Sequence, residues 1–114
     1  MNVMEEREFF RREFEGVDAD ALWSAVKRAL ATQDLKDADD SERTARFATG
    51  MGVWSWGQNL LVRVEEGVAP TVVVRGRPKS SFLSSNFGET REAKKLEEQF
   101  VPDIETALEE QRAA

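Results

Sequence analysis

Three residue types that carry much of protein chemistry are missing from this chain, which has no cysteine, no histidine and no tyrosine. Without cysteine it can form no disulfide, thiolate metal site, iron–sulfur cluster or thiol nucleophile. Without histidine it lacks the commonest general base and the main ligand of zinc and non-haem iron. Acid–base chemistry is left to carboxylates, lysine and serine. We therefore expect no enzymatic activity, no cofactor and no metal site.

Long apolar runs are also missing. No stretch approaches the about 18 apolar residues of a membrane span, and the first residues, Met-Asn-Val-Met-Glu-Glu-Arg, lack the basic start and apolar run of a secretory signal. These features predict a cytoplasmic protein. The net charge is −6, from 22 acidic and 16 basic residues, so the molecule as a whole should repel nucleic acid and anionic membranes.

Length and composition fit one globular domain. The chain has 114 residues, of which 40% are hydrophobic and 33% charged, which is enough for one hydrophobic core. We predict a single domain over residues 1–114, with an ordered core at about residues 8–110.

The clearest predicted helix covers residues 17–33. Asp18 precedes it as an N-cap, and its apolar residues recur at helical spacing. These residues are Leu22, Trp23, Val26, Ala29 and Leu30.

The segment before this helix, residues 8–15, has two interpretations. The alternation of Phe10, Arg12 and Phe14 with their neighbours, followed by Gly16, favours a strand. The Glu and Arg content and the four-residue spacing of Phe10 and Phe14 favour a helix. We favour the strand, and the helix stays open as the alternative.

A period of two dominates the middle of the chain. Residues 34–42 are acidic and predict an irregular strand followed by a turn. Three alternating segments follow, 43–49, 53–65 and 71–77, and turn residues separate them. This pattern predicts an antiparallel meander.

The last predicted helix covers residues 89–111. Its apolar stripe keeps the same phase on both sides of Pro102, which favours one kinked helix over two helices. The order strand, helix, three or four strands, helix predicts an α+β fold. We expect a two-layer sandwich of the form β-α-β-β-β(-β)-α, with an antiparallel sheet and both helices on one face.

This order resembles that of small bacterial α+β domains of uncharacterised function. The resemblance also includes Ser55-Trp56-Gly57 inside the long strand and Phe87-Gly88 before the last helix. Such domains are similar in outline to TATA-binding-protein-like and START-like folds. The resemblance covers residues 8–110, and it implies a fold without implying an activity.

Alternation assigns one set of side chains to the helix-covered face of the sheet. The set is Ala45, Phe47, Trp54, Trp56, Leu60, Val62, Val64, Val72 and Val74. The simpler interpretation is that they fill the core. The alternative is a cleft between the sheet and the last helix that holds a small apolar, lipid-like ligand. Its lining would be Trp54, Trp56, Phe82 and Phe100.

The opposite parity gives a basic face on an acidic protein. It carries the cations Arg46, Arg63, Arg75, Arg77 and Lys79, the apolar residues Leu61 and Val73, and Glu65 as the only acid of the set. One interpretation is a solvated face with surface ion pairs, each worth no more than about 1 kcal/mol. The functional interpretation is a surface for a protein partner or for a second copy in a homodimer.

Nucleic acid is the less favoured partner of this face, because sheets that bind it usually stack bases on aromatic residues. We therefore predict a non-enzymatic binding or regulatory module. A carrier of a small apolar ligand is the alternative.

Overall fold

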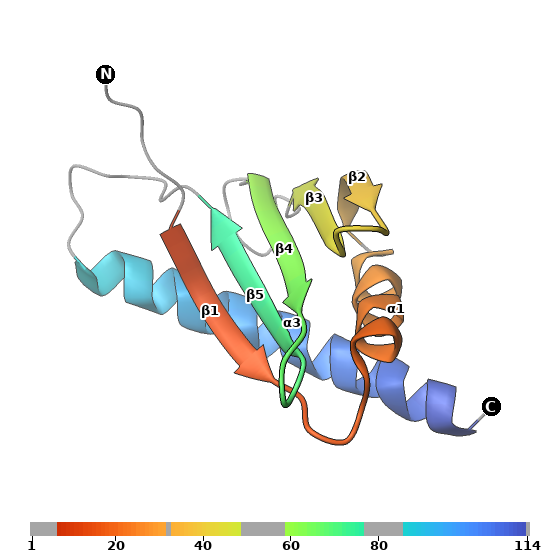
Figure 1. Cartoon of the computed structure of the whole chain (residues 1–114). Coiled ribbons are helices and arrows are strands. Elements are labelled where there is room, and N and C mark those ends of the chain that lie inside the picture. The colour runs from red at the N-terminus through yellow and green to blue at the C-terminus, as the bar shows by residue number, and fades with distance from the viewer. Residues whose placement is uncertain (1–6, 32, 49–58, 77–85, 114) are drawn as a thin grey trace.

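Five strands and two helices make up the part of the chain that the computed structural model describes, residues 7–31, 33–48, 59–76 and 86–113 (Figure 1). In chain order they are β1 (Arg7–Glu13), α1 (Ala19–Leu30), β2 (Asp34–Asp39), β3 (Thr44–Ala48), β4 (Asn59–Glu65), β5 (Thr71–Gly76) and α3 (Asn86–Ala113). The predicted α+β class and element order are confirmed. The part of the predicted long strand before Asn59 lies outside the described residues.

The strands form one antiparallel sheet in the order β1-β5-β4-β3-β2. The strand interpretation of residues 8–15 is confirmed, since they contribute β1. Its partner is β5, with Phe10 opposite Val74 and Arg12 opposite Val72. The first strand of the chain therefore closes one edge of the sheet beside the last strand.

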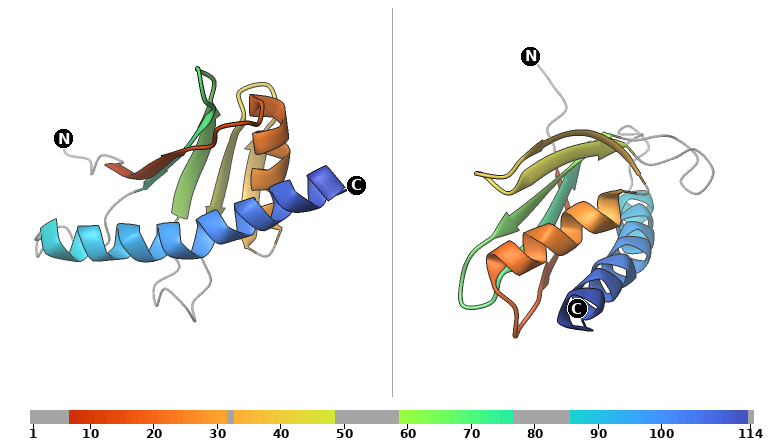
Figure 2. Two further views of the ribbon diagram at one scale, coloured as in Figure 1. Left: turned by 90° about the horizontal axis from the view of Figure 1, so that it is seen from below. Right: turned by 90° about the vertical axis from the view of Figure 1, so that its right-hand side faces the viewer.

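Both helices lie on the same face of the sheet and pack against each other (Figure 2). The sequence starts α1 at the expected place, because the Asp18 side chain accepts a hydrogen bond of 2.8 Å from the Ala21 N–H. Such a cap satisfies one of the free amide groups at a helix N-terminus.

The C-terminal helix is continuous through Pro102, as predicted, and it begins at Asn86 rather than at Glu89. Proline has no N–H, so one helical hydrogen bond is missing at this point. Pro102 is exposed, and water can therefore satisfy the freed carbonyl group. α3 bends part-way along its length (Figure 2), which is a usual consequence of an internal proline.

The core lies between the sheet and the two helices. Phe47 on β3 stacks on Phe100 of α3, with ring centroids 5.7 Å apart. We call the side of the sheet that faces the helices the inner face. All the described side chains predicted to point inward are buried there, namely Ala45, Phe47, Leu60, Val62, Val64, Val72 and Val74. Trp54 and Trp56, from the same prediction, lie outside the described residues.

Candidate functional site

The outer face is the side of the sheet turned away from the helices, and neither α1 nor α3 covers it (Figure 2). The strand register decides which side chains it carries. The three central strands contribute Thr71, Val73 and Arg75 on β5, Leu61, Arg63 and Glu65 on β4, and Thr44, Arg46 and Ala48 on β3. The edge strands add Glu8, Arg11 and Glu13 on β1, and Asp37 and Asp39 on β2.

Three arginines surround Leu61 at the centre of the outer face. Arg75 and Arg46 stand opposite Leu61 on the two neighbouring strands, which places their Cα atoms about 10 Å apart. Arg63 follows Leu61 by two residues on the same strand, about 7 Å away. All three arginines are exposed and Leu61 is half-buried. We call Arg46, Arg63 and Arg75 the arginine triad.

The register brings these predicted contact residues together on one face, and two further members of the prediction, Arg77 and Lys79, lie outside the described residues. The predicted role of Val73 needs a correction. It has the expected parity, but it is only 2% exposed. Arg11 and Arg63 flank it in register, and the stems of long side chains cover apolar neighbours. Among the described residues of this face, Leu61 is therefore the apolar one that a partner could reach.

The outer face is less uniformly basic than the sequence suggested, because the edge strands add acids beside Glu65. Arg11 donates hydrogen bonds of 3.0 and 3.1 Å to the two carboxylate oxygens of Glu8, and its guanidinium lies 3.6 Å from Glu65. The hydrogen bonds from Arg11, helped by the charges of Arg11 and Arg75, hold the pKa of Glu8 below its ordinary value. The arrangement is a cationic centre with acidic flanks.

Both edges of the sheet discourage the addition of another strand. The register shifts between Glu8 and Phe10 on β1 and between Leu35 and Asp37 on β2. Both edge strands also carry exposed charged side chains. Bulges and charges at an edge oppose pairing with a strand of another chain. An interaction through the sheet would therefore use the outer face.

The predicted ligand cleft has one member among the described residues. Phe100 is 4% exposed and fills the core against Phe47. Trp54, Trp56 and Phe82 lie outside the described residues, so the ligand-carrier alternative stays a prediction.

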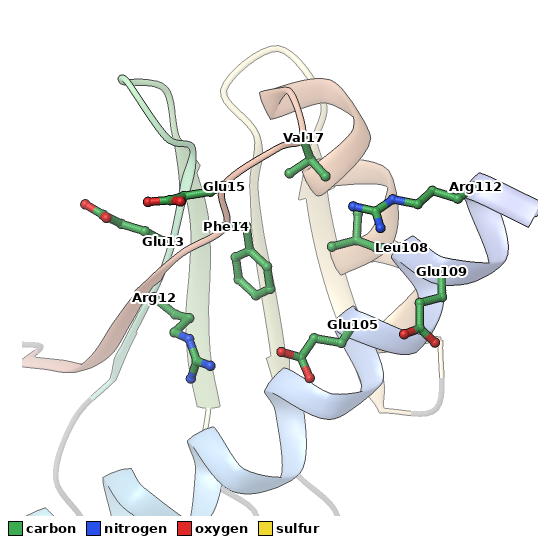
Figure 3. Close-up of a pocket in the computed structure, with 9 residues that line it drawn as sticks. All are labelled: Arg12, Glu13, Phe14, Glu15, Val17, Glu105, Leu108, Glu109 and Arg112. Carbon is green, nitrogen blue, oxygen red and sulfur yellow. The ribbon is translucent and has the colours of Figure 1, made fainter.

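A groove of about 450 Å³ lies between the segment that joins β1 to α1 and the last turns of α3 (Figure 3). Its apolar lining is small: Phe14, which points toward α3, and Leu108 are each only 8% exposed, and Val17 is half-buried. The other lining residues are charged, namely Arg12, Glu13, Glu15, Glu105, Glu109 and Arg112. Such a charged lining does not suit a lipid-like ligand. Periodicity gave no signal for this groove, since it forms where residues far apart in sequence meet.

The turn between β2 and β3 is fixed to α1 and to the turn after β4. Arg43 has a positive φ of 54°, and its guanidinium lies 2.8 Å from an Asp20 oxygen and 2.9 Å from a Glu66 oxygen. This residue accepts a backbone conformation that favours glycine. Its side chain links the β2–β3 turn to α1 and to the turn after β4.

A second link joins the same turn to α1. Asp40 accepts hydrogen bonds of 2.8 Å from Lys27 and 2.9 Å from the Trp23 indole, and the Lys27 nitrogen lies 5.5 Å from the centre of that ring. The hydrogen bonds from Lys27 and Trp23 lower the pKa of Asp40. Both links serve the packing of α1 on the sheet.

Within the described ranges, no three or more His, Cys, Asp or Glu side chains come together in a way that could hold a metal ion. None of the described helices has the length and apolar character needed to cross a bilayer.

Comparison with known proteins finds no family model that matches the chain and no similar curated protein. The candidate site is therefore defined from the residues of this chain alone. The outer face, where the register brings the arginine triad around Leu61, is the candidate contact surface.

Proposed function

We propose that this chain is a non-enzymatic binding or regulatory module whose outer face contacts another protein chain, either a different protein or a second copy. The observation that carries the proposal is the arginine triad around half-buried Leu61, on a face that no described helix covers. Interfaces are enriched in arginine, and their centres combine it with apolar contact.

The charged edges support a face-directed contact over strand addition. The absence of cysteine, histidine and tyrosine supports binding over catalysis. We further infer a cytoplasmic location and a bacterial origin. We also propose that the fold of this chain resembles TATA-binding-protein-like and START-like folds in outline.

The test compares two charge-reversed variants in affinity capture from an extract of the source organism. Arg63→Glu/Arg75→Glu alters the outer face. Lys94→Glu/Lys95→Glu makes the same change in net charge at exposed positions of α3, on the opposite layer. We expect the wild type and the α3 variant to retain the same proteins, or to self-associate alike in sedimentation, and the outer-face variant to lose that association.

A protein that is monomeric, and whose captured partners are the same for both variants, would contradict the proposal. Far-ultraviolet circular dichroism on each variant confirms that a loss of binding does not come from a loss of folding.

A further inference from the structure

We draw no further inference here: the strongest candidate, the groove between the β1–α1 connection and the last turns of α3, is lined chiefly by exposed side chains of both charges, and nothing in the structure shows what covers it.

Discussion

The two faces of strand β4 are built from adjacent residues and lie in different surroundings. Leu60, Val62 and Val64 are buried against the helices, whereas Leu61, Arg63 and Glu65 face away from them. Because successive side chains of a strand alternate, a slip of one residue would exchange the two sets. The apolar stripes of α1 and α3 fix the register, because Leu60, Val62 and Val64 must point inward to pack against them. The outer set does not pack against the helices, which is why we propose it as the contact surface.

The largest expected effect on stability comes from a substitution on the inner face. Phe47→Ala removes a ring that is 1% exposed and stacked on Phe100. The free energy of unfolding should fall by about 3–5 kcal/mol, as for other buried aromatic truncations. Urea denaturation measures it. Leu61→Ala, on the outer face, should cost less than about 1 kcal/mol, and equal losses for the two variants would contradict the assignment of faces.

A smaller loss of stability is expected from changes at Arg43, whose side chain links α1 to two turns of the sheet. Removing its side chain breaks the links to Asp20 and Glu66, so both Arg43→Ala and Arg43→Gly should lower the unfolding midpoint. Glycine adopts a positive φ without the steric cost of a β-carbon. Arg43→Gly should therefore unfold about 4–8 °C above Arg43→Ala, the shift that roughly 1 kcal/mol causes in a small domain. An alanine variant as stable as the glycine variant would argue against the left-handed conformation.

The acid dependence of stability should be sensitive to Asp40. Its pKa is lower in the folded chain than in the unfolded chain. The ionised carboxylate therefore contributes stability at pH values above the ordinary aspartate pKa of about 4. That contribution is lost as the pH falls through the lower folded value. Asp40→Asn should lower the urea midpoint at pH 7 and lower it by less at pH 2.5, because the stability contributed by the wild-type carboxylate decreases as the pH falls. A loss of equal size at both pH values would mean that the charge of Asp40 is not the cause.

The smallest effect on stability should come from the arginine triad. The outer-face variant Arg63→Glu/Arg75→Glu replaces two exposed side chains, and such surface substitutions usually stay within about 0.5 kcal/mol each. Its urea denaturation curve should nearly overlay that of the wild type. A loss comparable to that of Phe47→Ala would show that these arginines support the fold, which would remove them as dedicated contact residues.

Sequence periodicity predicted the fold well where one face of an element is buried. The helix around Leu22 and Val26, the strands containing Val62 and Val74, and the continuous helix through Pro102 were all expected. The strand β1 was harder to predict, since Phe10 and Phe14 fit both periods. Its pairing with β5 resolves the question, and pairing between distant segments leaves no mark in local sequence.

The candidate surface was predicted only in part for the same reason. Parity within the central strands correctly placed Arg46, Arg63 and Arg75 on one face. It could not reveal that β1 brings Glu8 and Arg11 beside them, or that Val73 is covered at its place between Arg11 and Arg63. The composition of a sheet face depends on the order of its strands as well as on their alternation.

The central claim is that the outer face is the contact surface of this protein. Chemical modification of arginines with phenylglyoxal, mapped by mass spectrometry with and without a captured partner, tests it most directly. The partner should slow the modification of Arg63 and Arg75 and leave that of Arg28, an exposed arginine on α1, unchanged. Protection of Arg28 with full reactivity at Arg63 and Arg75 would place the contact on the helical layer and contradict the claim.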